Sequence, residues 1–266
     1  MSEEEASPAE EVRPAGRRVV CGKCLRPGRV CLCAFFPPDG PIDTSRGTRV
    51  VILQHPMEAK KALATARLAP HVIRRASVIT GRRLRRSTVP TDSAREAVFR
   101  ALDEGTLWVV FPGAGAAPFS EREVEESGTS LAASQEESKG GGVTLLLLDG
   151  TWKQGKEMFT ALYEDKHDGE AFRRAPLVYL SPQCLQRPLE DAGLLRKEPA
   201  PGCVSTLEAV AEALFHIEGR DDAAAKVREA IIRVYDALVA FQRDRGAPHL
   251  VRREKDARRD IGKAGV

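Results

Sequence analysis

Four of the chain's six cysteines lie within thirteen residues, at a spacing that suits a metal centre. They are Cys21, Cys24, Cys31 and Cys33. Four thiolates so close together can surround one tetrahedral ion; zinc is the default for an all-sulfur site, and an iron–sulfur cluster is the main alternative. Since nothing in the sequence indicates secretion, we favour a metal site over disulfides and expect a reducing compartment. A closed site of this kind is structural, and it would fold and position residues 19–40.

A short polar turn follows the most apolar segment of the chain. Residues 143–148 predict a buried strand, and Asp149-Gly150-Thr151-Trp152 comes directly after it, where a helix starts. The backbone N–H groups at a helix start lack partners, so a carboxylate there can cap the helix or bind a ligand. Gly150 lets a ligand approach the backbone closely. The alternative is structural, with Asp149 as a helix cap and Trp152 as a core ring.

Two further polar groups are candidates for the same region. Ser205-Thr206-Leu207-Glu208 has the form of a capping box, in which Ser205 accepts from the backbone N–H of Glu208 and the Glu208 side chain reaches back. This structural interpretation is sufficient, and a functional role requires that the helix start share a crevice with Asp149. His55 follows an apolar run and is expected at the carboxyl edge of that strand, with a surface histidine as the alternative.

A basic block stands out in a nearly balanced chain. The formal net charge is only +3, yet no acidic residue occurs between Glu58 and Asp92. The block could be a solvated face, but more than thirty residues without a carboxylate favour contact with phosphates. The residues predicted to make these phosphate contacts are Lys60, Arg67, Arg74, Arg75, Arg82, Arg83, Arg85 and Arg86.

Alternating apolar strands and helices must position these groups. Apolar runs predict strands at 49–54, 107–111, 143–148 and 177–180. Helices are predicted at 60–68, at 93–102, from 152 to about 162, at 206–217 and at 222–243. This order predicts an α/β fold with a mostly parallel sheet and helices on both faces. Ligands bind such sheets beyond the carboxyl ends of the strands, which singles out Pro112-Gly113, residues 149–152 and the loop after Leu180.

The 266 residues suffice for one sizeable domain with appendages. Residues 41–245 are predicted to form this domain, with a flexible acidic and serine-rich insertion at 121–142. Residues 1–18 are predicted to be a disordered acidic tail and 246–266 a basic tail. No apolar run approaches the roughly 20 residues that cross a bilayer, and the N-terminus resembles neither a signal nor a transit peptide. We therefore expect no membrane contact and a cytoplasmic or nuclear location.

Together these motifs resemble the DTW-domain family, named for an Asp-x-Thr-Trp motif, whose members are tRNA-uridine aminocarboxypropyltransferases. The similarity runs from Cys21 to about Leu214. Besides the cysteines, it rests on Gln54-His55-Pro56-x-Glu58, Thr65-Ala66-Arg67-Leu68, Phe111-Pro112-Gly113, Asp149-x-Thr151-Trp152, Leu180-Ser181-Pro182 and Ser205-Thr206-x-Glu208-Ala209. Several short motifs in the same order are far more specific than any one of them.

The resemblance implies a SPOUT-like α/β fold, in which the chain near the C-terminus threads a trefoil knot that holds S-adenosylmethionine; periodicity does not reveal such a knot. Family members transfer the 3-amino-3-carboxypropyl group of S-adenosylmethionine to N3 of a uridine in tRNA, which forms acp3U and leaves 5'-methylthioadenosine. We expect Trp152 to pack against the sulfonium and to shield its methyl group. The residues expected to bind S-adenosylmethionine are Pro112, Gly113, Asp149, Thr151, Trp152, Leu180, Ser205 and Thr206.

The N3 proton of uridine must leave before N3 can attack, so the site needs a base or an electrostatic partner. Asp149 is the first candidate, ahead of Glu208 and His55, and it could instead hold the amino group of S-adenosylmethionine. Two other functions stay open. A methyltransferase with the same cofactor would release S-adenosylhomocysteine, and a noncatalytic zinc-bearing RNA-binding protein would bind no S-adenosylmethionine.

Overall fold

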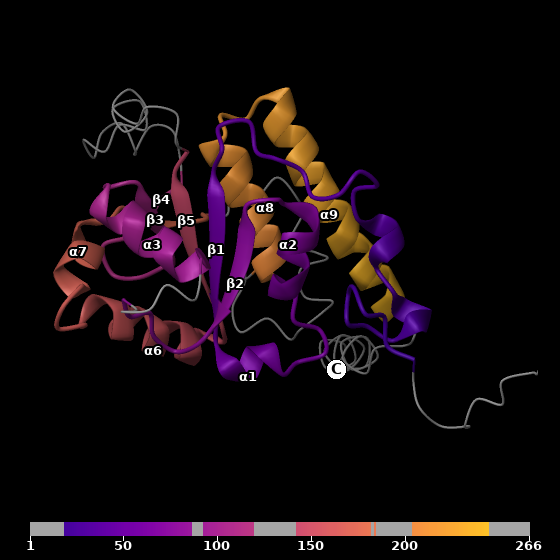
Figure 1. Ribbon diagram of the computed structural model, residues 1–266, viewed down its shortest axis with the longest axis horizontal. Helices are drawn as coiled ribbons and strands as arrows, with labels where there is room; N and C mark the ends of the chain where they lie inside the picture. The colour runs from indigo at the N-terminus through magenta and orange to yellow at the C-terminus, as the bar shows by residue number, and fades with distance from the viewer. Residues whose placement is uncertain (1–18, 87–92, 120–141, 182–183, 185–203, 245–266) are drawn as a thin grey trace, which may run out of the picture.

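A computed structural model describes residues 19–86, 93–119, 142–181, 184 and 204–244 of the chain. The predicted tails at 1–18 and 246–266, and nearly all of the predicted insertion at 121–142, lie outside the described residues. A twisted sheet stands at the centre, with α2, α8 and α9 on one side and α3, α6 and α7 on the other (Figure 1). The prediction of an α/β fold with helices on both faces is confirmed.

Six parallel strands form the sheet in the order β2-β1-β5-β3-β6-β4. Their bounds are β1 Arg49–Gln54, β2 Ala76–Thr80, β3 Leu107–Val110, β4 Ala117–Pro118, β5 Thr144–Asp149 and β6 Leu177–Tyr179. β5 lies between β1 and β3, and its register pairs Gln54 with Asp149. The carboxyl ends of these two neighbouring strands, β1 and β5, therefore meet at one edge of the sheet.

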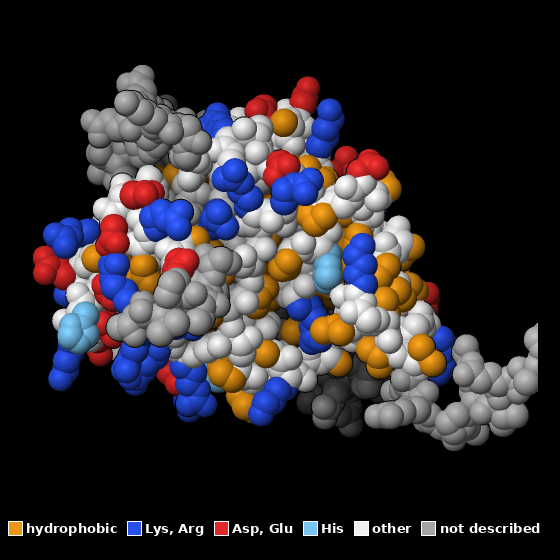
Figure 2. Space-filling view, viewed as in Figure 1, with side chains coloured by type: hydrophobic (Ala, Val, Ile, Leu, Met, Phe, Trp, Pro, Cys, Tyr) orange, Lys and Arg blue, Asp and Glu red, His pale blue; other side chains and the backbone are white. Residues whose placement is uncertain are grey.

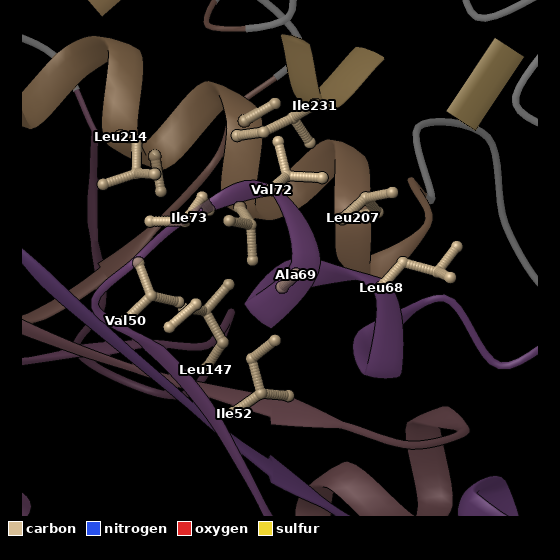
Figure 3. Close-up of a cluster of buried hydrophobic side chains, with 14 of the residues drawn as sticks. Val50, Ile52, Leu68, Ala69, Val72, Ile73, Leu147, Leu207, Leu214 and Ile231 are labelled. Carbon is tan, nitrogen blue, oxygen red and sulfur yellow. The ribbon is translucent and has the colours of Figure 1, made fainter. Parts of the chain in front are cut away.

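The apolar runs form central strands because both of their faces are covered. Alternate residues of a strand point to opposite faces. Val50 and Ile52 pack with Leu147 against α2, α8 and α9 (Figure 3), whereas Val51 and Leu53 pack against α3 and α6. The sheet thus separates two hydrophobic cores, and burial on both faces explains why these strands show no polar alternation.

The longer helices follow their predicted bounds closely. They are α3 Ser93–Asp103, α6 Trp152–Tyr163, α8 Thr206–Ile217 and α9 Asp222–Arg243, with the short α7 Gly169–Arg174 before β6. In the part of the chain that the structure describes, no helix is both long and apolar enough to cross a bilayer.

The predicted helix at 60–68 is wrong. The chain instead forms α1 (Pro56–Ala59), the 3-10 turn η3 (Ala66–Leu68) and α2 (Ala69–Val72). Proline is favoured in the first turn of a helix and disfavoured in its interior, so Pro56 starts α1 early. Pro70 likewise lies in the first turn of α2, so two short helices replace the single long one.

The cysteine-rich segment packs on the main core and is not a separate body. Its two 3-10 turns are η1 (Gly28–Val30) and η2 (Cys33–Phe35). Leu32 and Phe36 belong to the core beneath α9, and the Phe35 ring meets that of Phe241 at a centroid distance of 6.1 Å. The predicted knot near the C-terminus is not tested by the described residues, so it stays a prediction.

Candidate functional site

Asp149 ends β5, and its carboxylate joins three segments that are distant in sequence. Its Oδ2 accepts a hydrogen bond of 2.7 Å from Gln54 Nε2, at the end of β1. Its Oδ1 accepts one from Thr206 Oγ1, in the first turn of α8. The Asp149 side chain is only 3% exposed. The structure therefore brings the start of α8 to Asp149 and fixes the carboxylate between two donors.

The residues beside Asp149 cap two helices. Thr151 is the N-cap of α6 and forms a capping box with Gln154, so the alternative in which Asp149 is the cap is wrong. Ser205 caps α8: its Oγ accepts from the Glu208 N–H at 3.2 Å, and Glu208 Oε2 accepts from the Ser205 N–H at 2.8 Å. The predicted capping box at 205–208 is confirmed, and this bond occupies one oxygen of the buried Glu208 carboxylate.

Trp152 stands at the rim of the site and is not a core ring. Its residue exposure is 49%. One stack of rings supports it, since Trp152 lies 5.7 Å from Phe111, Phe111 lies 5.1 Å from Phe159, and Phe159 lies 4.1 Å from Tyr163, measured between centroids. The Lys156 ammonium lies 5.0 Å from the indole centroid, a cation–π contact. The indole is thus both exposed and able to hold a cation.

Two glycines make this ring stack possible. A Cβ on Gly155 would lie 2.8 Å from the Phe111 ring, and a Cβ on Gly113 would lie 2.9 Å from the Phe159 ring. Both distances are shorter than a side chain tolerates, so each glycine is required for the rings to pack where they do. Two other predicted cofactor residues follow strands. Pro112 comes shortly after β3 and is exposed, and Leu180 comes directly after β6 and is half-buried.

His55 is buried at 2% exposure, so the alternative of a surface histidine is wrong. Its Nδ1 accepts a bond of 3.2 Å from the Met57 N–H, which places the proton of the neutral ring on Nε2. Nε2 has no hydrogen-bond partner among the described residues and lies 3.8 Å from Glu157 Oε2. His55 is therefore built to donate through Nε2, which argues against its predicted role as a proton acceptor.

A groove of about 1120 Å³ runs along the outer side of α6. Basic side chains dominate its lining, and Lys and Arg side chains gather along this edge of the molecule (Figure 2). Its cations are Arg82, Arg83, Arg85, Arg86, Lys153, Lys156 and Lys166. Its acidic residues are Glu157, Glu164, Asp165 and Asp168. Half of the predicted RNA-binding residues therefore share one concave surface.

The rest of the basic block lies elsewhere. Lys60 and Arg67 flank the connection after α1, and Arg67 donates to the Lys61 carbonyl. Arg74 and Arg75 precede β2, so they lie at the opposite, amino edge of the sheet, where Arg74 bonds Asp43 at 2.8 Å. The predicted block is thus split between two edges of the sheet.

Arg86 has a structural role that the sequence did not reveal. It makes a two-pronged contact with Asp103, at 2.8 and 2.6 Å, and a third bond of 2.7 Å with Asp168. The hydrogen bonds that the Arg86 guanidinium donates, first to Asp103 and then to Asp168, raise its pKa above the usual range. Because these carboxylates already engage its donors, Arg86 is less available to phosphates than an unpaired arginine would be.

The four cysteines of the N-terminal segment come together as a metal site requires. All four sulfur atoms lie within 4.8 Å of one another, with Cys21 and Cys33 at 3.5 Å and Cys24 and Cys31 at 3.6 Å. A tetrahedron with Zn–S bonds of about 2.3 Å has sulfurs about 3.8 Å apart, so the set fits one ion. Backbone N–H groups of Cys24 and Lys23 lower the pKa of the Cys21 thiol to about 6, which favours the thiolate that binds metal.

Burial and the neighbouring thiols raise the pKa of Cys33 to about 12. A thiol that holds its proton so firmly has to lose it before it can bind a metal, and a cation supplies the compensating charge. The arrangement can therefore hold a metal ion.

Three contributors to the site were not predicted. The sequence indicated no role for Gln54 beyond its place in a motif, yet it holds Asp149. Glu157 lies between His55 and Arg82, with distances of 3.8 and 3.6 Å to them. Lys156 lies over Trp152. The spacing of Trp152, Lys156 and Glu157 places them on neighbouring turns of one helix, which is a signal that could have found the last two.

Comparison with known proteins accords with these features. A family model described as "DTW domain" matches residues 18–243. The tRNA-uridine aminocarboxypropyltransferase 2 of Macaca fascicularis is 32% identical over 238 residues, which cover 89% of this chain and 67% of that protein. The protein of the same name from Mus musculus is 33% identical over 239 residues, with 89% and 67% covered. The tRNA-uridine aminocarboxypropyltransferase A of Arabidopsis thaliana is 31% identical over 227 residues, with 85% and 81% covered.

No solved structure matches the chain significantly. The family model spans most of the sequence and includes both the cysteine cluster and the Asp149–Trp152 turn. The chain therefore belongs to the DTW-domain family.

Proposed function

We propose that the protein transfers the 3-amino-3-carboxypropyl group of S-adenosylmethionine to N3 of a uridine in tRNA. The names of its relatives supply the reaction class. The observation that carries the proposal is the arrangement at the carboxyl edge of β5, where a fixed carboxylate, Asp149, shares one turn of the chain with an exposed indole, Trp152. A negative charge beside an aromatic ring is suited to a positively charged donor.

In the proposed reaction, a bond forms between N3 and the terminal carbon of the aminocarboxypropyl chain while the bond from that carbon to sulfur breaks. The sulfur leaves as the neutral thioether of 5'-methylthioadenosine, and the N3 proton leaves to a base. All three carbons on the sulfonium are electrophilic, so the carbon that faces N3 at attack distance decides the product. Trp152 is proposed to pack against the sulfonium and to shield the methyl group; the Lys156 contact supports this role, because it shows that a cation can lie over the ring.

Asp149 is proposed to act as the electrostatic partner of the donor. Two hydrogen bonds and deep burial hold its carboxylate in one place, which suits a fixed charge better than a group that must reach a nucleobase. Glu157 joins the candidate proton acceptors, since its carboxylate is 47% exposed and faces the groove. The His55 Nε2–H is proposed to donate to Glu157 or to substrate.

The proposal also covers how the protein binds tRNA, how it encloses S-adenosylmethionine and which metal ion it holds. The basic groove along α6 is proposed to hold tRNA phosphates, with binding that weakens steeply as salt rises. A flipped or unpaired uridine is required, because N3 is paired inside a helix. A SPOUT-like knot near the C-terminus is proposed to enclose S-adenosylmethionine. Cys21, Cys24, Cys31 and Cys33 are proposed to hold a structural zinc ion.

The decisive experiment incubates the purified protein with bulk tRNA and S-adenosylmethionine and analyses nucleosides and small products by mass spectrometry. We expect acp3U and 5'-methylthioadenosine. A methylated nucleoside with S-adenosylhomocysteine would favour the methyltransferase, and absence of S-adenosylmethionine binding would favour the noncatalytic RNA-binding protein. Either result would overturn the proposal.

Matched variants then assign the residues. Trp152→Ala should lose transfer and donor affinity, whereas Trp152→Phe should keep a part of both; unchanged turnover and affinity in Trp152→Ala would refute its role. Asp149→Asn should raise the dissociation constant of S-adenosylmethionine if Asp149 is the electrostatic partner. A normal dissociation constant with a lower kcat would instead assign it as the proton acceptor.

A further inference from the structure

Three arginines lie at chain positions near the amino edge of the sheet, on the side away from Asp149. Arg49 begins β1 and Arg75 immediately precedes β2. The parallel register pairs Val50 with Ala76, so these arginines occupy neighbouring positions, and the Val50 N–H donates to the Arg75 carbonyl at 2.9 Å. We call Arg49, Arg75 and Arg100 the amino-edge cluster.

Arg100 lies in the last turn of α3. Alternate residues of a strand point to the same face, so Arg49 shares a face of β1 with Val51 and Leu53. Val51 and Leu53 belong to the hydrophobic core that includes α3, so this is the face that α3 covers. The chain after α3 returns to the amino edge, where Thr144 donates to the Thr106 carbonyl and Arg49 pairs with Thr144. Figure 2 shows Lys and Arg side chains near the upper end of β1, with Asp and Glu side chains beside some of them.

Within the part of the chain that the structure describes, no carboxylate neutralises the positive charge of the amino-edge cluster. No ion pair with a described carboxylate involves any of its three members, and Arg75 donates only to the Gly47 carbonyl, at 3.2 Å. Burial and the like charges of Arg75 and Arg100 lower the pKa of Arg49. Like charges gathered in this way repel one another, and an anion from outside would relieve the repulsion.

We propose that Arg49, Arg75 and Arg100 bind the phosphate backbone of the RNA substrate, as a second anchor at the opposite edge of the sheet from the reaction site. The proposal rests on the proposed function, because it takes tRNA as the substrate. Arg75 and Arg100 are exposed, and an exposed group of guanidiniums suits a polyanion bound by several contacts.

The distance between the amino-edge cluster and Asp149 determines how the cluster can contribute to the reaction. Arg49 and Gln54, the partner of Asp149, stand at the two ends of β1. A strand rises about 3.3 Å per residue, so the two sites are about 17 Å apart. One nucleotide cannot bridge them. The cluster therefore contributes to the affinity for a folded RNA and not to the chemistry at N3.

The test compares the full-length chain with two double variants of equal charge. Arg75→Gln/Arg100→Gln removes two members of the cluster and spares the partly buried Arg49. Lys226→Gln/Arg233→Gln removes two exposed charges from α9, on the other face of the sheet. Binding of fluorescent tRNA is measured by anisotropy over a series of salt concentrations, and acp3U formation is measured at saturating tRNA.

For the cluster variant we expect the slope of log affinity against log salt to fall by about 1.5, since each lost phosphate contact removes about 0.7–0.9. Its kcat should stay normal, and the α9 variant should keep the wild-type slope. Equal slopes in the two variants, or no change in either, would overturn the proposal. A further outcome is that the wild type forms no acp3U while the salt slope of the cluster variant is still lower than those of the wild type and the α9 variant. That result would refute the proposed reaction but would support the RNA-binding role of the cluster.

Two further readouts distinguish an RNA anchor from a structural role and from a small-anion site. The cluster variant should unfold at the wild-type temperature or above, because it relieves like-charge repulsion; a lower temperature would assign the arginines a structural role instead. Inorganic phosphate is the second probe. If phosphate stabilises the wild type but not the cluster variant, while both bind tRNA equally, the site takes a small anion and the proposal is wrong.

Discussion

Gln54→Met isolates the hydrogen bond that holds Asp149 in place. Gln54 and Asp149 are each 3% exposed, and the Nε2 to Oδ2 distance is 2.7 Å. Methionine has nearly the same length and volume as glutamine, so the packing of β1 is kept while the donor is lost. Because the acceptor is a buried carboxylate, we expect the free energy of unfolding to fall by about 2 kcal/mol, within the usual range of about 1.5–3 for bonds to charged groups.

Urea unfolding and thermal melting test this expectation. A loss of about 2 kcal/mol corresponds to a fall of about 4–8 °C in Tm for a chain of this size. The control repeats Gln54→Met in an Asp149→Leu background, where the amide has lost its acceptor, so the change should be neutral or stabilising. An equal loss in both backgrounds would mean that packing, and not the bond to Asp149, is responsible, and the reasoning would be refuted.

Three other predictions follow from the structure. Removal of metal by a chelator, or Cys33→Ser, should lower the Tm, because the cysteine cluster holds its segment on the core beneath α9; an unchanged melting curve would exclude a structural metal. Gly155→Ala should cost about 1–3 kcal/mol in urea unfolding, because its Cβ would lie 2.8 Å from the Phe111 ring. A wild-type stability would contradict that packing. Burial raises the pKa of Tyr163 from 10.0 to about 12, so its contribution to stability is complete below about pH 10 and is lost as the pH rises to about 12. In Tyr163→Phe this alkaline loss should disappear, and an absorbance titration should lack one phenol that ionises near pH 12; a titration identical to the wild type would show that Tyr163 ionises normally.

Periodicity predicted the elements whose packing is strongest. β1, α8 and α9 have their predicted bounds. An uninterrupted apolar run is compatible with a buried strand, and a capped amphipathic stretch is compatible with a helix that starts at its cap, so in each case the pattern determines both the type and the bounds of the element. β2 was missed, since its five residues mix small, polar and apolar types and it lies at an edge of the sheet. The wrong helix at 60–68 has a related cause: the composition there is helical, but the neighbouring prolines decide where helices start.

The location of the site in the fold could be predicted from the sequence, but the contacts between its residues could not. The rule for parallel sheets located Asp149 at the carboxyl edge. It could not show that Thr206, 57 residues later, and Gln54, 95 residues earlier, donate to the same carboxylate. Nor could a count of charges show that the basic block divides between the groove along α6 and the amino edge. Both facts depend on how the chain crosses the sheet, which local sequence does not encode.

The burial of Asp149 and the exposure of Trp152 have a common structural cause. β5 is a central strand, so its last residue is enclosed by β1 and α8. Thr151 then caps α6, which puts Trp152 at the first position of the helix, beyond the sheet. Gly150 keeps the turn tight, because a Cβ there would lie 2.9 Å from the Gln154 Cβ.

One strand–turn–helix connection thus places a fixed charge and an open ring in the same turn of the chain. An extra residue in the turn would rotate the start of α6 by about 100°, from its 3.6 residues per turn, and would carry Trp152 away from Phe111. The spacing of the Asp-x-Thr-Trp motif is therefore a geometric requirement of this connection: the aspartate must end a buried strand, the threonine must cap the next helix, and the tryptophan must lie in its first turn.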